Sequence, residues 1–404
     1  MTLMTTTTAE GAGSRRNVLI LAICQALSMS GSSLVMTISA LAGQMLATDK
    51  TLATLPLASQ FIGTMCATIP ASYLMARYGR RVGFTFGQCI GVAGASLACW
   101  AILSGNFWAF VAGSCTLGVH NAFWQYYRFA AADTAPADFR ERAISYVMAG
   151  GVIAAFLGPQ IAKWTYDLFT PVQYAGGYVG IITMSMLTMV LLQAVKTPKT
   201  EFKGFAGGGR PLAEIVRQPT FILAVATAMF GYGVMTLVMT ATPLAMTGCG
   251  FAFTHTATVI QWHVLAMFGP SFFTGDLIRR FGVVNVIIAG AVLNTGAMAA
   301  NLSGIDIANF TGGLVLLGLG WNFLFIGGTT LVTETYRPEE KAKVQAINDF
   351  LLWTTVSVAS LSSGAIHAHF GWTAVNMVLA VPMFAIFLGA VWFRISGPGN
   401  PSRA

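Results

Sequence analysis

Long apolar segments follow one another along almost the whole chain, separated by short polar connections. A helix needs about 20 consecutive apolar residues to cross the hydrocarbon core of a bilayer. Measured against that length, the chain holds twelve such segments, and we predict an all-α polytopic membrane protein. The predicted spans are residues 18–42, 52–76, 82–104, 107–129, 143–164, 173–195, 219–245, 255–278, 283–303, 309–332, 344–366 and 372–393.

The composition agrees with a membrane protein. Only 9% of the residues are charged and 55% are hydrophobic, whereas an average soluble domain has about 25% charged residues. The six cysteines include no Cys-x-x-Cys pair, so neither a disulfide framework nor a zinc knuckle is indicated. No Gly-rich phosphate-binding loop ending in Lys-Ser or Lys-Thr occurs, so ATP is not the predicted energy source. We predict no cofactor and no metal.

The basic residues are distributed unevenly between the two sides of the predicted membrane. Of the 22 Lys and Arg residues, Lys50 and Lys163 lie on one side and Arg128 lies at the end of the fourth span. The remaining 19 lie in the termini and connections of the other side. Such an excess marks the cytoplasmic side, which places both termini in the cytoplasm. The net charge of +8 therefore reflects membrane orientation, and we predict no nucleic-acid partner.

Two short motifs recur about half a chain apart. Arg77-Tyr78-Gly79 precedes Arg280-Phe281-Gly282 by 203 positions, and Asp133-Thr134 precedes Glu334-Thr335 by 201. Internal repeats of this kind build many transporters. We therefore predict two similar six-helix bundles, residues 1–195 and 219–404, joined by a cytoplasmic linker at residues 196–218 that is rich in Lys and Gly.

The loop after the second predicted span carries a family resemblance. It reads Ser72-Tyr73-Leu74-Met75-Ala76-Arg77-Tyr78-Gly79-Arg80-Arg81, and it resembles the G-x-x-x-D-R-x-G-R-R loop of the major facilitator superfamily. The resemblance covers essentially the full chain. It implies a bacterial inner-membrane transporter with twelve helices in two pseudo-symmetric bundles, which works by alternating access. Arg77, Gly79, Arg80 and Arg81 match the motif, whereas Ser72 and Ala76 replace its Gly and Asp.

In the family, the missing Asp belongs to a charge network that steadies the outward-open state. Asp133 is a candidate substitute, because it lies at the inner end of the fourth span and can pair with Arg80 or Arg81. By repeat symmetry, Glu334 can pair with Arg279 in the second motif, which also contains Arg280 and Gly282. The alternative is ordinary loop charge, worth under about 1 kcal/mol. Both interpretations stay open.

Polar side chains within the spans are candidates for function, because the bilayer makes them costly. His120, Trp124, Tyr127 and Arg128 are spaced to share one face of the fourth span, with Asn121 and Gln125 beside it. The resemblance implies that spans one, four, seven and ten line a central cavity. The predicted substrate-binding residues are Gln25, Ser28, His120, Asn121, Trp124, Arg128, Tyr232, Trp321 and Asn322, with Ser32 and Thr236 on the same stripes.

A lining of aromatic and amide side chains suits a flat, mostly uncharged organic molecule. Each candidate also has a structural alternative. Trp124 and Trp321 can serve helix packing. His120 has the stronger claim to a functional role, because a buried imidazole needs a partner and can titrate near neutral pH. Arg128 can extend toward the lipid headgroups or bind an anionic part of the substrate.

A second group of residues is predicted to serve coupling or gating. Asp349 lies about one and a half turns into the eleventh span, beside Asn348, and it is the carboxylate most clearly placed inside a span. It can carry a coupling proton, or it can hold the inner gate by accepting hydrogen bonds from neighbouring helices. His263 in the eighth span is the other titratable candidate.

The leading hypothesis is a monomeric secondary transporter that moves a small organic solute, for example an aromatic vitamin such as a flavin, with protons as one candidate driving ion. The alternative is a proton-coupled drug or metabolite exporter, for which Gly158-Pro159 resembles part of the family's antiporter motif. A third hypothesis is a membrane-bound enzyme or metal-binding receptor built on His255, His367 and His369.

Overall fold

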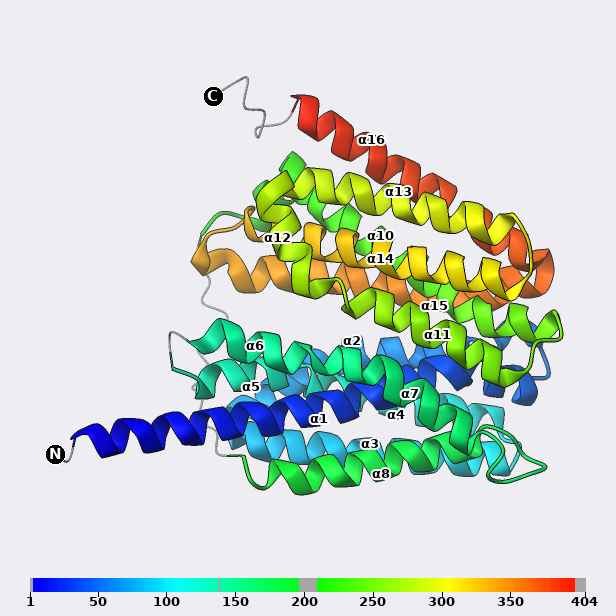
Figure 1. Cartoon of the computed structure of the whole chain (residues 1–404), viewed down its shortest axis with the longest axis horizontal. Coiled ribbons are helices and arrows are strands. Elements are labelled where there is room, and N and C mark those ends of the chain that lie inside the picture. The colour runs from blue at the N-terminus through cyan, green and yellow to red at the C-terminus, as the bar shows by residue number, and fades with distance from the viewer. Residues whose placement is uncertain (1–2, 137–138, 196–208, 397–404) are drawn as a thin grey trace. The chain divides into compact units, whose positions relative to one another are not determined.

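The computed structural model describes residues 3–136, 139–195 and 209–396, and these ranges are almost entirely helical (Figure 1). They contain no β-strand, and Phe169 and Val172 form only an isolated bridge. The chain divides into two compact units, residues 1–47 with 59–202 and residues 48–58 with 203–404. Most of the linker predicted at residues 196–218 lies outside the described residues, which resume at Gly209.

The N-terminal unit is a bundle of helices. Helix α1 packs against α7 and α8, and α3 packs against α4 and α8. In Figure 1, α3 and α8 run side by side along this unit. Its helices are α1 (Leu3–Leu46), α2 (Leu55–Tyr78), α3 (Arg80–Leu103), α4 (Phe107–Trp124), α5 (Tyr127–Thr134), α6 (Arg140–Met148), α7 (Gly150–Thr165) and α8 (Ala175–Leu192).

Glycine allows two of these helix pairs to touch backbone to backbone. A Cβ atom on Gly118 of α4 would lie 2.8 Å from the carbonyl carbon of Gln60 in α2, and the Thr64 hydroxyl donates to the Gly118 carbonyl at 2.9 Å. A Cβ on Gly158 of α7 would lie 2.7 Å from the Ser30 carbonyl oxygen in α1. Small residues make such close approach possible where lipid offers no hydrophobic drive for association. Gly158 therefore has a packing role.

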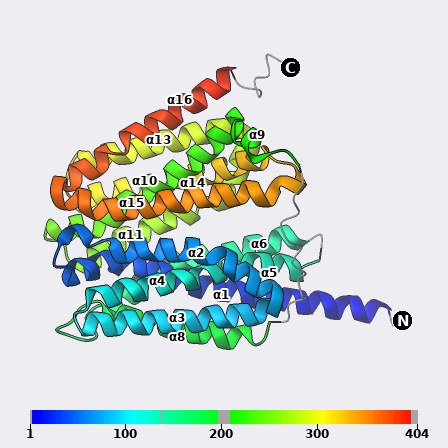
Figure 2. The same ribbon diagram turned by 180° about the vertical axis from the view of Figure 1, so that it is seen from behind.

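The C-terminal unit has a comparable arrangement. Helix α10 packs against α14 and α15, and α13 packs against α14 and α16; Figure 2 shows these neighbours from behind. Its elements are η1 (Lys50–Leu52), α9 (Leu212–Val216), α10 (Pro219–Gly248), α11 (Phe253–Phe268), α12 (Ser271–Phe281), α13 (Val283–Leu302), α14 (Ile307–Thr333), η3 (Pro338–Glu340), α15 (Lys341–Met377) and α16 (Ala380–Ser396).

The multi-pass helical architecture predicted from the sequence is confirmed, but the count of twelve uninterrupted spans is not. Within the described residues, nine segments are long and apolar enough to cross a membrane. One of them, Lys343–Ile395, is 53 residues long and kinks at Gly371, so it corresponds to the last two predicted spans. The predicted spans 107–129 and 255–278 are absent from the nine, and each is divided into two helices, α4 with α5 and α11 with α12.

The internal repeat is visible in the backbone. Gly79 has φ 90° and ψ 154°, Gly282 has φ 83° and ψ 147°, and each begins the next helix. These dihedrals belong to a region that is essentially restricted to glycine. The Arg77 guanidinium lies 5.5 Å from the Tyr78 ring centre, and the equivalent Arg280 lies 5.3 Å from that of Phe281. The two copies of the motif therefore share both their turn and their cation–π contact.

The ion pairs of the two motifs differ. Arg80 pairs with Asp133, which is one of the two pairings that the sequence suggested. The expected pairing of Arg279 with Glu334 is wrong, because Arg279 pairs with Asp276 on its own helix, one turn away. Glu334 is exposed and makes no ion pair with any described residue. The glycine turn occurs in both copies because it depends only on the backbone conformation of a short segment. The ion pairs differ because they depend on which helix ends approach one another.

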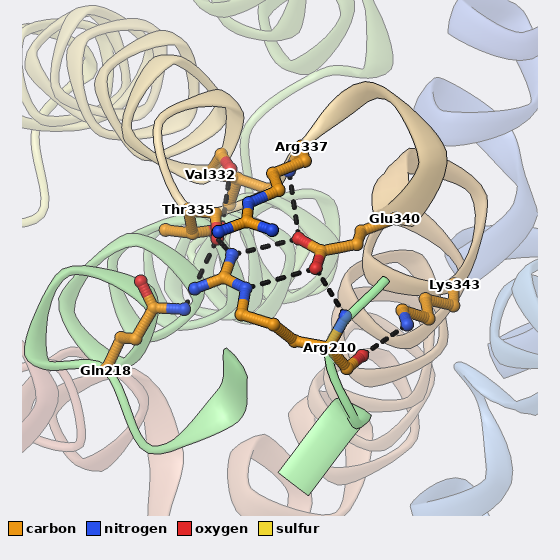
Figure 3. A network of polar contacts seen from close by, with 7 residues as sticks. All are labelled: Arg210, Gln218, Val332, Thr335, Arg337, Glu340 and Lys343. Atoms are coloured by element: carbon orange, nitrogen blue, oxygen red, sulfur yellow. Dashed lines mark hydrogen bonds and ion pairs between the residues drawn. The ribbon is translucent and has the colours of Figure 1, made fainter. Parts of the chain in front are cut away.

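A further polar network, not predicted from the sequence, joins several segments of the C-terminal unit (Figure 3). Its centre is Glu340, whose side chain has no exposed surface. The Glu340 carboxylate accepts hydrogen bonds from Arg210 Nε at 3.0 Å and from the Arg337 backbone N–H at 2.9 Å. Arg210 and Gln218 both donate to the Thr335 carbonyl oxygen, at 3.0 and 3.3 Å. The network thereby ties the segment before α9 to the loop between α14 and α15.

Candidate functional site

A narrow polar pocket lies within the N-terminal unit, among α1, α2, α4 and α8. Its polar lining comes from hydroxyl and amide side chains, and its apolar lining comes from aliphatic side chains and glycine. The lining residues are Leu27, Ser28, Gly31, Ser32, Val35, Gln60, Leu117, His120, Asn121, Ile181, Met184 and Ser185. Ser28, His120 and Asn121 were predicted from the sequence to bind substrate, and the structure brings them together here.

Asn121 is the best-connected amide of this pocket. Its Oδ1 accepts hydrogen bonds from Ser32 Oγ at 3.3 Å and from Trp124 Nε1 at 2.9 Å. A carbonyl oxygen that accepts two bonds is fixed in orientation, so the remaining NH2 group is held in one direction. Neither hydrogen of that NH2 group takes part in these bonds, which leaves Asn121 with donors for a ligand.

Gln60 is a pocket residue that sequence reasoning missed. It is buried, and its Oε1 has no hydrogen-bond partner within the described part of the chain. Gln25 on α1, which was predicted from the sequence, also has a buried Oε1 without a hydrogen-bond partner among the described residues. A buried amide oxygen without a partner is costly unless a ligand or water uses it. The signal for Gln60 was present in the sequence as a polar residue within the apolar segment 52–76.

His120 lines the pocket, but its ring is anchored toward α3. Its Nδ1 lies 2.9 Å from the Gly87 carbonyl oxygen, and the ring packs over Gly91. Because a carbonyl oxygen only accepts, Nδ1 must carry the hydrogen. His120 therefore fastens α4 to α3 and in this way positions the neighbouring Asn121.

The prediction that His120, Trp124, Tyr127 and Arg128 share one helical face is wrong. Helix α4 ends at Trp124, and Tyr127 begins α5 after a turn. The Tyr127 ring is fully buried, and its hydroxyl oxygen accepts a hydrogen bond from Gln88 Nε2 at 2.7 Å. The Arg128 guanidinium lies 4.8 Å from the Phe129 ring centre. The sequence between Trp124 and Tyr127 contains neither Pro nor Gly, so no helix-breaking residue marks this break. We attribute the break to the packing of the buried Tyr127 side chain, which the helical periodicity of the sequence does not reveal.

An aromatic cluster occupies the C-terminal unit, on α10, α11, α14 and α15. Trp321 and Phe325 are stacked with ring centres 5.0 Å apart and an interplanar angle of 7°. The Tyr232 ring lies 5.3 Å from Trp321 and 5.8 Å from Trp353, and Phe268 lies 5.9 Å from Trp321. Tyr232 and Trp321 were predicted from the sequence, whereas the other three rings were not assigned to a site.

The indole N–H of Trp321 donates no hydrogen bond to any described residue. Its Nε1 is buried and has no hydrogen-bond partner among the described residues, and the same is true of the Thr236 hydroxyl on α10. A buried indole N–H usually finds a partner. The C-terminal unit thus combines a packed cluster of aromatic rings with buried hydrogen-bonding groups that have no partner among the described residues.

Two other predicted residues are occupied by contacts within the C-terminal unit. The Asn322 amide donates to the Met267 carbonyl at 2.6 Å and to Ser271 Oγ at 2.7 Å, and its oxygen accepts from Thr274 at 2.6 Å. These bonds hold α14 against the break between α11 and α12. His263 is fully buried, and its Nδ1 lies 2.7 Å from the Leu314 carbonyl oxygen. Both side chains therefore fasten α14 to α11 and α12.

Asp349 and Asn348 lie near the start of α15. The Asn348 amide donates to Asp349 Oδ1 at 3.0 Å, and the Asp349 side chain is exposed at the protein surface. The Asn348 Oδ1 is buried and lacks a hydrogen-bond partner within the described ranges. The bond from Asn348 therefore orients a carboxylate that is accessible from the protein surface.

No group of three or more His, Cys, Asp or Glu side chains within the described part of the chain is arranged to hold a metal ion. His255, His367 and His369, on which the metal-receptor hypothesis rested, do not form such a group. The structure therefore gives that hypothesis no support.

Comparison with known proteins identifies the family. The sequence model of the Major Facilitator Superfamily matches residues 21–351 and 252–404. A riboflavin transporter of Brucella anthropi, RfnT, is 40% identical over 397 residues, which cover 98% of this chain and 100% of the relative. An uncharacterised transporter of the same superfamily from Bacillus subtilis, YdeG, is 27% identical and covers 94% of this chain and 92% of its own length.

Solved structures with the same fold are also transporters. A D-xylose–proton symporter superposes with a TM-score of 0.74 at 14% sequence identity, covering 93% of this chain and 96% of the symporter. The nucleoside transporter NupG superposes with a TM-score of 0.71 at 14% identity, covering 93% of this chain and 98% of its own. The fold, the repeated glycine turn and the near-complete sequence match agree, and the chain belongs to the major facilitator superfamily of membrane transporters.

Proposed function

We propose that this transporter carries riboflavin or a solute with the same flat, polar-edged ring system. The proposal rests on the 40% identity to the riboflavin transporter of Brucella anthropi and on one structural observation. That observation is the cluster of Trp321, Phe325, Tyr232 and Trp353, which includes an indole N–H without a partner among the described residues. A flat heteroaromatic ring with acceptor oxygens at its edge matches both features.

Each unit by itself offers one part of what such a molecule needs. In the C-terminal unit, aromatic faces supply stacking, which favours flat rings. In the N-terminal unit, Gln25, Ser28, Gln60 and Asn121 supply amide and hydroxyl groups that fix orientation. In transporters of this type, substrate binds near the membrane midplane. We therefore assign substrate contact to these residues and to Tyr232, Trp321 and Trp124.

The remaining predicted residues receive supporting roles in the proposal. His120 and Asn322 position their helices, because their polar atoms are engaged by backbone carbonyls. Arg128 lies against Phe129 near the membrane boundary, and we assign it to the lipid headgroup region. Asp349 is the proposed proton-coupling group, and Asn348 orients it.

The proposed setting is the bacterial inner membrane, with both termini in the cytoplasm as the distribution of basic residues predicts. Residues 1–195 and 219–404 are the proposed rocking bundles, residues 196–218 are the linker, and the working unit is a monomer that imports its substrate with protons. The exporter alternative rested on Gly158-Pro159. Gly158 is accounted for by the close approach of α7 to α1, so this motif provides no separate argument for export.

The test is uptake of radiolabelled riboflavin by intact bacterial cells that lack their own riboflavin importer and express this chain. We expect accumulation above the empty-vector level, which collapses when a protonophore is added. Accumulation that appears only after the protonophore is added would identify an exporter. No riboflavin-dependent signal in either condition, from protein that is present in the membrane, would overturn the proposed substrate.

A binding measurement separates substrate recognition from transport direction. Aromatic stacking quenches flavin fluorescence, so titration of riboflavin with the purified chain reports binding without a gradient. Quenching together with failed uptake would retain the substrate and reject only the coupling scheme.

A further inference from the structure

An open groove of about 570 Å³ lies on the outer surface of the N-terminal unit, apart from the polar pocket. It is formed by the first turns of α3 and by Gln193, the residue that caps the end of α8. Its lining consists of Arg81, Val82, Thr85, Phe86, Cys89 and Gln193. No residue of this groove lines the candidate substrate pocket, so a separate explanation is needed.

The cation at one end of the groove is held in place by neutral groups. Arg81 Nε and one of its terminal nitrogens donate to Gln193 Oε1 at 3.3 and 2.8 Å. The Gln193 amide in turn donates to Thr85 Oγ1 at 3.2 Å and to the Met189 carbonyl at 3.0 Å. The Gln193 amide, which Thr85 and Met189 hold in place, therefore fixes the orientation of the Arg81 guanidinium. An arginine fixed in this way loses little further freedom when it binds an anion.

The charge of Arg81 is not neutralised within the described part of the chain. Three ion pairs occur there, and Arg81 takes part in none of them, whereas the adjacent Arg80 is paired with Asp133. A guanidinium has five N–H donors, and Gln193 uses only part of them. The groove also lies at the positive end of α3, where Gly79 provides no side-chain cap. An anion is the ligand that both features favour.

Apart from Arg81, Thr85 and Gln193, the groove is lined by the exposed side chains of Val82, Phe86 and Cys89. Val82 is 55% exposed and Phe86 is 48% exposed, and both follow Arg81 along the outer face of α3 toward the membrane interior. Apolar side chains in this position face lipid tails. The groove therefore presents an oriented cation at the membrane boundary and a hydrocarbon surface directly below it.

We propose that this groove is a binding site for an anionic glycerophospholipid. The lipid phosphate contacts the free N–H groups of Arg81, and one acyl chain lies along Val82, Phe86 and Cys89. Basic pockets between transmembrane helices on the cytoplasmic side suit acidic headgroups. A free phosphate ion would use Arg81 but would leave the apolar part of the groove without a function, so we commit to the lipid.

The experiment is native mass spectrometry of the full-length protein in detergent, titrated with phosphatidylglycerol. Two variants change the cation end of the groove in different ways. Arg81→Gln removes the charge, and Gln193→Glu keeps Arg81 but places a carboxylate against its guanidinium. Arg394→Gln is the matched control, because Arg394 is an exposed cation in the last turn of α16. Equal thermal unfolding midpoints establish that the variants are folded.

We expect each groove variant to raise the dissociation constant for phosphatidylglycerol about fivefold, the effect of roughly one basic side chain near an anionic surface. The control should stay within the error of the unmodified chain, and zwitterionic phosphatidylethanolamine should bind more weakly than phosphatidylglycerol. Unchanged binding in both groove variants, or an equal loss in Arg394→Gln, would overturn the proposal. Displacement of the lipid by millimolar inorganic phosphate would show a simple anion site and would also overturn it.

Discussion

The guanidinium of Arg210 and the fully buried carboxylate of Glu340 form a two-point ion pair, with Nε to Oε1 at 3.0 Å and a terminal nitrogen to Oε2 at 2.9 Å. The Arg210 backbone N–H adds a third bond to Glu340 at 2.7 Å, and the Lys343 ammonium donates to the Arg210 carbonyl. Charge-assisted, bidentate bonds of this kind are the strong ones in proteins. The pair fixes the point at which the chain enters the C-terminal unit.

The first prediction concerns the pH dependence of this pair. Hydrogen bonds from the Arg210 side chain and from the Arg337 backbone hold the pKa of Glu340 well below its usual range. A lowered folded-state pKa gives stability that is fully present above the unfolded pKa of about 4.3 and is lost as the pH falls below it. We expect the thermal unfolding midpoint of the purified chain to fall on acidification, and Glu340→Gln to lower it at neutral pH.

Glu339→Gln is the control for this prediction, because Glu339 is the exposed neighbour in the same 3-10 turn. It should leave the midpoint and its pH dependence almost unchanged. Equal effects of the two substitutions would show that the buried pair contributes nothing specific.

The second prediction concerns the two glycine turns. Gly79 and Gly282 have positive φ with open space around the Cβ position, so any cost of substitution comes from backbone strain and not from a clash. Gly79→Ala and Gly282→Ala should each destabilise the protein by about 1–3 kcal/mol. Gly275→Ala is the control, because Gly275 also has open space but lies within helix α12. Urea or thermal unfolding in detergent measures the difference, and a loss of stability as large in Gly275→Ala would contradict the strain argument.

The third prediction concerns the contact between α2 and α4. Gly118→Ala places a methyl group against the Gln60 backbone, which cannot move aside as a flexible side chain would. Overpacking of this kind costs typically about 1–3 kcal/mol. Because Gln60 and Asn121 line the same pocket, the substitution should also weaken riboflavin binding.

Gly312→Ala, in helix α14 with open space at its Cβ position, serves as the control for the third prediction. It should be neutral or slightly stabilising, because Ala favours helix over Gly. If both variants keep full stability and binding, the close approach of α2 to α4 is not required.

The fourth prediction concerns the aromatic cluster. Stacking of a flat heteroaromatic ring on an aromatic side chain contributes about 1–3 kcal/mol. We therefore expect Trp321→Leu to raise the KM for riboflavin uptake about tenfold or more. Trp392→Leu removes an indole that is 57% exposed on α16, and it should leave KM unchanged. An unaltered KM in the Trp321 variant would remove this residue from the substrate site.

The fifth prediction separates coupling from gating at Asp349. Asp349→Asn keeps the size and the hydrogen-bonding capacity of the side chain but removes its titration. If Asp349 couples transport to protons, concentrative riboflavin uptake should be lost while exchange of internal for external riboflavin persists. Loss of both activities in folded protein would indicate a gate, and retention of both would exclude Asp349 from either role.

The candidate site was only partly predictable from the sequence. Ser28 and Asn121 stood out because they are polar residues inside apolar segments, and they line the observed pocket. Gln60 carried the same signal and was missed. Phe268, Phe325 and Trp353 carried no signal, because an aromatic side chain in a membrane helix looks the same whether it packs against lipid or in a cluster. Their contribution became visible only when four helices were brought together.

The sequence by itself determined the membrane setting, the helical fold and the repeat. These follow from hydropathy and from local backbone preference, and both are properties of short segments: the turn at Gly79 and its copy at Gly282 are legible without any tertiary contact. The tertiary structure alone decided that Glu340 meets Arg210, 130 residues away. It also decided that the Asn322 amide forms its hydrogen bonds with α11 and α12. A side chain's partner depends on which elements approach in space, and residue order does not encode that locally.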